Sequence, residues 1–265
     1  SRLGERFTEI AYRPYFQRFS PFQGADRPMN GIFADTEGSY GYKLAWSHGL
    51  EERFLQNTGL ELKKVLPLMI DEDAEGLEAK VRFQWYDAVS DLFTENFSVP
   101  AKSAEEHGMY YTMHTWEESL PFQANTVGDY FKLNRAVTLP GTDCLVNVAY
   151  NPANFWDAMS VAEFQGRRYM AEMMALAGLD EFHMEELKKQ ANYLAAWGVS
   201  HFITHAVKMT RTKAQSVVTP DFYRTDPAWQ HMGQWTDYVR RISYMNAHGK
   251  LLADVLVLNP MDSIW

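Results

Sequence analysis

The chain has 265 residues, of which 46% are hydrophobic and 22% charged, so it has the composition of a globular protein with a sizeable core. Asp and Glu total 34 against 25 Lys and Arg, which gives a net charge of −9. This charge disfavours a nucleic-acid backbone or an anionic membrane as partner. We therefore expect neither nucleic acid nor a membrane as partner. No apolar run approaches the length of a membrane span either.

Cysteine and aromatic content narrow the possibilities further. Cys144 is the single cysteine, which excludes an internal disulfide and a cysteine-rich zinc site. Aromatic residues make up 14% of the chain, which mildly favours a carbohydrate ligand because aromatic faces stack on sugar rings, although a large aromatic core explains the same composition. The N-terminal sequence SRLGERFTEI shows no secretory signal. The chain begins abruptly, so a signal could have been removed or could lie upstream. We expect a periplasmic or secreted protein.

Short apolar runs alternate along the chain with longer amphipathic stretches, and the two patterns predict strands and helices respectively. Gly198 and Gly249 are predicted to end two of the helices, and Asp226 is predicted to cap the start of another. In chain order the pattern predicts strand 30–35, helix 80–107, strand 109–116, helix 122–137, strand 143–150, helix 154–164, strand 167–172, helix 184–197, strand 199–206, helix 226–248 and strand 253–260.

This alternation predicts an α/β fold with a parallel sheet covered by helices. A doubly wound sheet would show a glycine-rich turn after its first strand, and none is present. Polar residues instead follow several different strands, which favours a (β/α)8 TIM-type barrel. Only six strands are evident, so we expect the first strands to lie upstream. We therefore interpret residues 1–265 as a single catalytic barrel domain, incomplete at its N-terminus, from a longer chain whose flanking domains are missing.

Two acids follow the first predicted strand, in the sequence FADTEG. Asp35 and Glu37 would point to one side of an extended strand, so they could share a site. Asp and Gly are also common where a turn begins, and that reading is equally consistent with the sequence.

A second polar group follows the strand in YYTMHTWEES. His114, Trp116, Glu117 and Glu118 lie close together there, and this combination is typical of a sugar-binding site. Glu117 or Glu118 could instead favour the first turn of the next helix, where a carboxylate complements the helix dipole.

The third acid, Glu172, lies in the otherwise apolar run RRYMAEMMAL. A salt bridge with Arg167 or Arg168 is the structural alternative, but both arginines lie at the other end of the predicted strand. Because a buried carboxylate is costly unless it is paired or used, we favour a functional role. Two glutamates from different strand ends suit general acid and base catalysis, specifically the cleavage of a glycosidic bond.

Other chemistries fit the sequence less well. No HExxH, GxSxG, CxxC or P-loop pattern occurs. His201 and His205 are four residues apart, which is metal-ligand spacing on a helix but not on a strand. We therefore interpret His205 as a substrate contact and His201 as a core or rim histidine.

The order of motifs resembles the catalytic barrel of glycoside hydrolase family 106, the α-L-rhamnosidases, and related family-2-like bacterial hydrolases. The resemblance runs through nearly the whole chain and rests on six stretches: GIFADTEG, EEHGMYYTMHTWEES, VGDYFKLNRAVTLPGTDCL, FWDAMSVAEFQGRRYMAE, WGVSHFITHAVKMT and LLADVLVLNPMDSIW. The chain departs from the family pattern at Thr36, which separates two acids that are usually adjacent, and at Met113, which replaces a glycine. In the family a further α/β domain follows the last motif.

The resemblance implies an inverting hydrolase of oligosaccharides or polysaccharides with two catalytic glutamates, Glu117 as general acid and Glu172 as general base. These roles could be exchanged, and Glu118 could replace Glu117. Inversion needs a carboxyl separation of roughly 6.5–9.5 Å to leave room for water. The resemblance also implies a possible calcium ion, with no assignable ligands, and the following substrate contacts: Asp35, Glu37, His114, His205 and, as a stacking platform, Trp116.

Three alternatives remain open at this point. A retaining β-galactosidase-like or glucuronidase-like barrel would bring its two carboxyls to about 5–5.5 Å. A non-catalytic carbohydrate-binding barrel would keep the acids apart or pair them with arginine. A fragment that lacks strands and flanking domains would be inactive alone and would expose a sheet edge.

Overall fold

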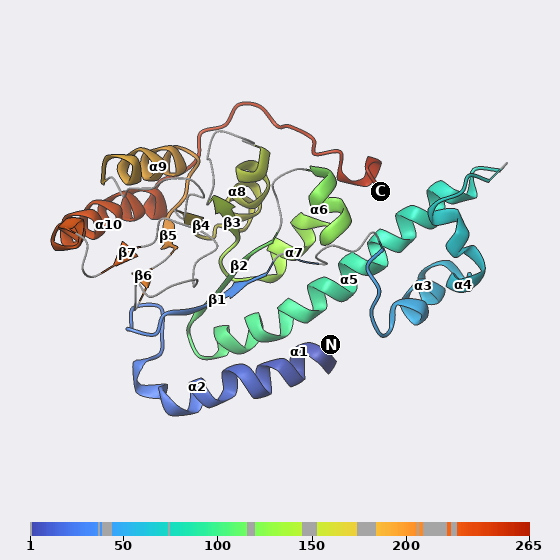
Figure 1. Cartoon of the computed structure of the whole chain (residues 1–265), viewed down its shortest axis with the longest axis horizontal. Helices are drawn as coiled ribbons and strands as arrows, with labels where there is room; N and C mark the ends of the chain where they lie inside the picture. Colours follow the sequence, from blue (N-terminus) through green and yellow to red (C-terminus); the bar gives the residue numbers. More distant parts are fainter. Residues whose placement is uncertain are drawn as a thin grey trace. The chain divides into compact units, whose positions relative to one another are not determined.

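The computed structural model describes residues 2–36, 38, 44–73, 75–115, 120–144, 153–173, 184–205, 207–208, 222–223 and 227–265 (Figure 1). Helices alternate with short parallel strands over much of this part of the chain, so the predicted α/β class is confirmed. The residues group into two compact units, one formed by residues 1–138 with 255–265 and the other by residues 139–254. The prediction of one catalytic domain is not tested by this grouping.

The first unit begins with helical segments that run almost without interruption. Gly4 of α1 lies so close to α5 that an added Cβ would stand 2.9 Å from the backbone oxygen of Asn96, so this contact requires glycine. These segments were not predicted, although Leu3, Phe7 and Ile10 have the spacing of one helix face. They are α1 (Arg2–Phe7), a π-helical turn (Thr8–Tyr12), α2 (Arg13–Arg18) and a 3₁₀ turn (Ser20–Phe22).

A long helix, α5 (Leu77–Glu106), runs through the first unit and confirms the helix predicted at 80–107. Its buried Val81 and Trp85 pack with Leu50 and Phe54 of α3. This apolar cluster fixes the small helices before α5 against it, and these helices are α3 (Leu50–Thr58), α4 (Leu62–Val65) and a 3₁₀ turn (Leu66–Met69).

Two parallel strands flank α5 in the sequence, β1 (Gly31–Asp35) and β2 (Tyr110–His114), and both confirm predicted strands. They pair so that Asp35 lies opposite His114 at their C-terminal ends. On the other edge of β2, the backbone N–H of Tyr111 donates to the hydroxyl oxygen of Thr138 at 2.6 Å.

The helix predicted at 122–137 is wrong in one respect, because the structure divides it into α6 (Leu120–Thr126) and α7 (Tyr130–Ala136). The break occurs at Gly128, whose φ of +74° lies in the left-handed region that favours glycine. A Cβ at this position would stand 2.1 Å from the hydroxyl oxygen of Ser90. The chain therefore turns at Gly128 because only glycine fits against α5 there.

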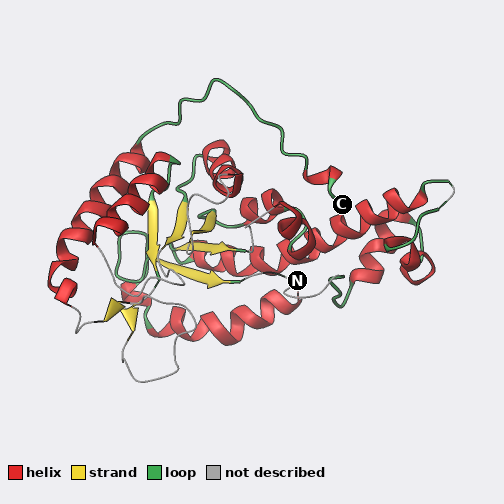
Figure 2. Cartoon of the chain, turned by 45° about the horizontal axis from the view of Figure 1, so that its top comes forward, coloured by secondary structure: helices red, strands yellow, loops and turns green. Residues whose placement is uncertain are grey.

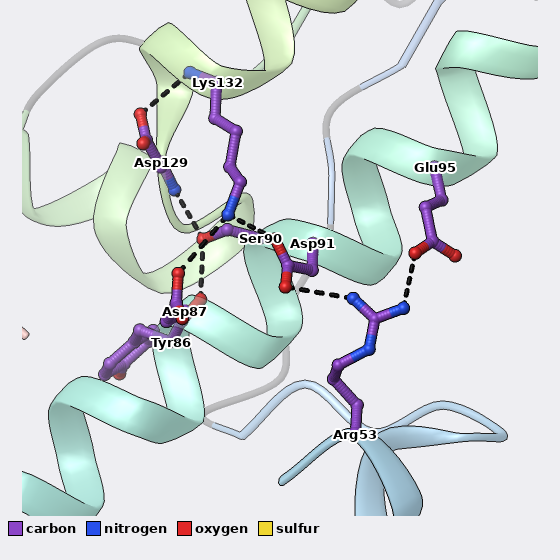
Figure 3. Close-up of polar contacts among 8 residues, drawn as sticks. All are labelled: Arg53, Tyr86, Asp87, Ser90, Asp91, Glu95, Asp129 and Lys132. Carbon is purple, nitrogen blue, oxygen red and sulfur yellow. Dashed lines mark hydrogen bonds and ion pairs between the residues drawn. The ribbon is translucent and has the colours of Figure 1, made fainter. Parts of the chain in front are cut away.

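Asp129 then starts α7. Its side chain accepts from the backbone N–H of Lys132 at 2.9 Å, which is the N-cap arrangement. Its own backbone N–H donates to the Ser90 hydroxyl at 2.8 Å, and that hydroxyl donates to the Tyr86 carbonyl oxygen at 2.6 Å (Figure 3). The capped helix is thereby tied to α5.

Charged side chains also join α3 and α7 to α5 (Figure 3). Arg53 of α3 donates to the carboxylate of Asp91 at 2.9 Å and also to that of Glu95. Lys132 of α7 lies 3.3 Å from the Asp87 carboxylate and also pairs with Asp91. Burial lowers the pKa of Lys132, but its hydrogen bond to Asp91 and the two nearby carboxylate charges outweigh burial and raise it. Both cations therefore stay charged and hold three helices together.

The second unit contains a parallel sheet in the order β3 (Gly141–Cys144), β4 (Met170–Met173), β5 (His201–Thr204). The predicted strands 167–172 and 199–206 are confirmed as β4 and β5. The predicted strand 143–150 is shifted, because β3 begins at Gly141 and residues 145–150 lie outside the described residues. All three strands are short, and Figure 2 shows them in yellow.

Helices connect and cover these strands. The predicted helices 154–164 and 184–197 are confirmed as α8 (Ala153–Gln165) and α9 (Met184–Ala196), and Gly198 follows α9 with a φ of +89°. The helix predicted at 226–248 is found as a 3₁₀ turn (Pro227–His231) and α10 (Met232–His248), while its predicted cap, Asp226, lies outside the described residues.

An unpredicted pair of two-residue strands lies between β5 and α10. These are β6 (Val207–Lys208) and β7 (Phe222–Tyr223), which pair in parallel.

The strand predicted at 253–260 is wrong. The chain there has no regular structure, and its apolar side chains face solvent, with Leu252 94% and Leu258 88% exposed. A run of apolar residues with high strand propensity forms a strand only where another strand pairs with it. None of the described residues offers one to residues 251–258. The C-terminus is fixed instead by a short 3₁₀ turn (Met261–Ser263) and by Trp265, whose ring stacks on Tyr86.

The described strands do not form a closed barrel. They form three separate parallel groups, β1–β2, β3–β4–β5 and β6–β7. The barrel therefore stays a prediction. In the described part of the chain, no helix is both long enough and apolar enough to span a membrane.

Candidate functional site

The ends of β1 and β2 bring together two residues predicted from separate stretches of sequence. Nε2 of His114 lies 3.7 Å from Oδ1 of Asp35. The His114 side chain is 1% exposed and the Asp35 side chain is 67% exposed, so a buried imidazole lies behind a carboxylate in contact with solvent. The Phe33 ring lies against the imidazole, with 5.4 Å between ring centroids.

The alternation of side chains along β2 explains this grouping. Residues paired in parallel strands point to the same face, so Asp35 and His114 share a face with Thr112. Tyr111 lies on the other face and packs edge-on against Tyr12, with ring centroids 6.1 Å apart. Burial strongly raises the pKa of the Tyr111 hydroxyl, so it stays neutral. The N-terminal helices therefore cover the Tyr111 face, and the polar residues lie on the opposite face.

In the second unit, the structure places Glu172 at the third residue of β4, and the residue is 3% exposed. The burial of Glu172 on β4 agrees with the strand predicted at 167–172, and its role as a catalytic carboxylate stays a prediction. Its partners in register are Asp143 on β3 and Ile203 on β5. Arg168, which was considered as an ion-pair partner for Glu172, donates to the backbone oxygen of Ser200.

The two histidines of the β5 region occupy different positions. His205 follows the end of β5, and its backbone N–H donates to the Met173 carbonyl oxygen at 2.9 Å, which extends the β4–β5 pairing by one residue. His201 starts β5. Burial, with a smaller contribution from the Arg168 charge, lowers the pKa of His201 to about 4. The half-buried His201 is therefore neutral at physiological pH, which is compatible with its interpretation as a core or rim histidine.

Four predicted site residues lie outside the described residues: Glu37, Trp116, Glu117 and Glu118. The pairing of Glu117 with Glu172, and the separation of their carboxyls, therefore stay predictions.

The sequence analysis missed Asp143. The expected strand 143–150 placed Asp143 at the beginning of the strand, where a polar residue is common and does not indicate a functional site. The observed strand begins two residues earlier, so Asp143 is its third residue and the register partner of Glu172. The preceding Pro140 and Gly141 could have indicated that the strand starts sooner.

The calcium ion implied by the family resemblance stays a prediction. Among the described residues, no three or more His, Cys, Asp or Glu side chains gather in one place. Calcium also binds backbone and amide carbonyl oxygens, so this observation assigns it no ligands.

Comparison with known proteins supplies the family. A model of glycoside hydrolase family 106, described as α-L-rhamnosidase, matches residues 10–263. The chain belongs to glycoside hydrolase family 106. This match confirms the resemblance found in the sequence, and it includes all the candidate site residues of both units.

Two relatives that this family 106 chain matches are much longer proteins. A provisionally named β-glucuronidase of Formosa agariphila is 24% identical over 226 residues, which cover 80% of this chain and 18% of that protein. The solved structure of a rhamnosidase from Novosphingobium sp. PP1Y matches with a TM-score of 0.68 at 18% identity, over 93% of this chain and 24% of that one. At this identity the structural match shows the fold alone. The chain spans about a fifth to a quarter of the relatives it matches.

Proposed function

We propose that the protein is a glycoside hydrolase that removes a terminal sugar, α-L-rhamnose, from an oligosaccharide or polysaccharide. The observation that carries this proposal is the family 106 match over residues 10–263. The acids and histidine at the ends of β1, β2 and β4 are compatible with it, because carboxylates and imidazoles are the groups that bind sugar hydroxyls and transfer protons.

We further propose that β1 to β5 belong to one (β/α)8 barrel. Two features support this arrangement: each sheet is parallel, and a helix connects β1 to β2, β3 to β4, and β4 to β5. In such a barrel the functional side chains come from the C-terminal ends of different strands. Asp35 and His114 each lie at such an end, and Glu172 is the third residue of β4.

The proposed mechanism is inversion with two carboxyl groups. Glu172 accepts a proton from a water molecule, whose oxygen attacks the anomeric carbon. Glu117 donates a proton to the glycosidic oxygen as its bond to that carbon breaks. Glu118 is the alternative donor, and the two glutamate roles could be exchanged. After one turnover Glu172 carries a proton taken from the water, and Glu117 has given its proton to the leaving group, so exchange with solvent restores both.

Substrate contacts follow from the same proposal. Asp35 and His114 bind sugar hydroxyls together, since the exposed Asp35 carboxylate lies 3.7 Å from the buried His114 imidazole. Glu37 and His205 add further polar contacts, and Trp116 stacks on a sugar ring. Export to the periplasm or beyond, where polysaccharides are found, is part of the proposal.

A second candidate is a retaining β-glucuronidase, favoured by the name of the Formosa agariphila relative. Retention would place the two catalytic carboxyls about 5–5.5 Å apart and would proceed through a glycosyl-enzyme intermediate. This candidate has weaker support, since it rests on one relative at 24% identity.

Hydrolysis of aryl glycosides by the protein, expressed with all the residues its gene encodes, tests the proposal. We expect release of 4-nitrophenol from the α-L-rhamnoside and not from the β-D-glucuronide. Glu172→Gln should lower kcat by a factor on the order of 10³ or more, since it removes the proposed base. The control is Glu163→Gln on the exposed side of α8, which should retain full activity. Activity of Glu172→Gln within a few-fold of the wild type would remove Glu172 from the mechanism.

A further inference from the structure

Asp143 and Glu172 lie side by side on neighbouring strands of the sheet in the second unit. They are register partners on the parallel strands β3 and β4. Paired residues of neighbouring parallel strands point to the same face, and such strands lie about 4.8 Å apart. The two carboxyl groups therefore share one face of the sheet.

The helices of this unit identify that face. The buried side chains of α9 include Leu187, Ala191 and Leu194, which form one apolar stripe, and α9 packs against β4. An apolar stripe fits the face that carries Ala171 and Met173. We infer that α9 covers this face, which leaves the carboxylates on the other.

A hydrogen bond from α9 fixes the backbone of β3 at Cys144. Nε2 of Gln190 on α9 donates to the backbone oxygen of Cys144 at 2.8 Å, and both residues are buried. This bond fixes the backbone directly after Asp143. Asp143 itself is only partly buried, whereas Glu172 is 3% exposed, so Asp143 is the more accessible of the two carboxylates.

We propose that Asp143 binds the substrate by accepting a hydrogen bond from the sugar hydroxyl on C2. This inference rests on the proposed function, in which Glu172 directs water to the anomeric carbon. C2 is bonded to that carbon, so its hydroxyl lies within reach of a carboxylate on the adjacent strand. Hydrogen bonds to this hydroxyl strengthen in the transition state of glycoside hydrolysis. Asp143 is then a specificity-determining residue beside the proposed base.

A cycle that combines one substitution with one substrate change tests this contact. The kcat/KM is measured for 4-nitrophenyl α-L-rhamnoside and its 2-deoxy analogue, with the wild type, Asp143→Asn and the control Glu163→Gln. The ratio of the two kcat/KM values is compared between proteins, because this comparison cancels the different intrinsic reactivity of the two substrates. We expect this ratio to differ between wild type and Asp143→Asn by about ten- to a hundredfold, the usual effect of a hydrogen bond to a charged group. Glu163→Gln should keep the wild-type ratio.

Each outcome decides the proposal. An equal ratio in wild type and Asp143→Asn, with the rhamnoside still hydrolysed by the wild type, would overturn the Asp143 contact and leave the proposed function intact. If the wild type hydrolyses neither rhamnoside, the proposed function and this inference are both wrong. Asp143→Ser serves for the same comparison if circular dichroism shows that Asp143→Asn does not fold. A purely structural role would lower the melting temperature and leave the ratio unchanged.

Discussion

Nε2 of His114 and Oδ1 of Asp35 lie 3.7 Å apart, across the last register pair of β1 and β2. Each residue was predicted from a different stretch of sequence, and the parallel pairing of the two strands brings them together. The carboxylate is exposed and the imidazole is buried, so the Asp35 carboxylate is the group of this pair that faces solvent.

We predict that Asp35 and His114 act on the substrate as a unit. Asp35→Asn and His114→Gln should each raise KM for the aryl rhamnoside by roughly tenfold or more, because each removes part of one hydrogen-bonded contact. The KM of the double variant should be little higher than that of the single variant with the higher KM, as expected for residues that share one interaction. Steady-state kinetics of the four proteins measures this, and fully additive effects would show that the residues act independently.

The Arg53 ion pairs should contribute measurably to stability. Arg53→Met leaves Asp87, Asp91 and Glu95 with Lys132 as their remaining cation in the network of Figure 3. We expect the free energy of unfolding to fall by about 1–2 kcal/mol, and by less at high salt. The measurement is urea unfolding of both proteins at two salt concentrations.

The matched control for Arg53 is Arg240→Met on α10. Arg240 pairs with Asp237, and its side chain is 73% exposed. Pairs this exposed contribute little to stability, so the control should lose about 0.5 kcal/mol or less. Equal losses for Arg53→Met and Arg240→Met would contradict the structural role of the network.

Gly128 should tolerate no side chain. Gly128→Ala places a Cβ 2.1 Å from the Ser90 hydroxyl oxygen in addition to straining a residue with positive φ. We expect a loss of about 3 kcal/mol or more, since a steric clash adds to backbone strain. Gly59→Ala is the control, because Gly59 also has positive φ but no atom within 4 Å of the added Cβ. Its loss should be about 1 kcal/mol. Similar melting temperatures for the two variants would mean that α7 can shift away from α5.

His201 should make stability depend on pH. Its pKa is lowered to about 4 in the fold, against 6.5 ordinarily, so the unfolded chain binds a proton at a higher pH than the folded one. Stability should therefore fall as the pH drops from about 6.5 to about 4, by up to roughly 3 kcal/mol. His201→Gln should remove this part of the dependence. Unfolding curves between pH 4 and pH 7 measure it, and an unchanged slope in the variant would assign the effect to other groups.

The sequence predicted well those elements whose pattern is local. Strands β1, β2, β4 and β5 were found because each is a short apolar run bounded by polar residues. The long helix α5 was found from its amphipathic period. The division between α6 and α7 was missed, although Gly128 and Asp129 carry both signals for it, a left-handed turn and an N-cap.

Other features depend on parts of the chain far away in sequence. The run 253–260 has strand composition, but a strand also needs a partner, and composition does not reveal whether one is present. Asp143 was missed for a related reason: its importance depends on the register between β3 and β4, and the apolar letters alone placed the start of β3 two residues late.

The central claim is inverting hydrolysis of a terminal α-L-rhamnoside, and the anomeric form of the first sugar released tests it most directly. Proton nuclear magnetic resonance can follow the reaction of the full-length protein with 4-nitrophenyl α-L-rhamnoside before mutarotation occurs. We predict that β-L-rhamnose appears first, because water attacks from the face opposite the leaving group. Release of α-L-rhamnose first, or of no rhamnose at all, would contradict this account.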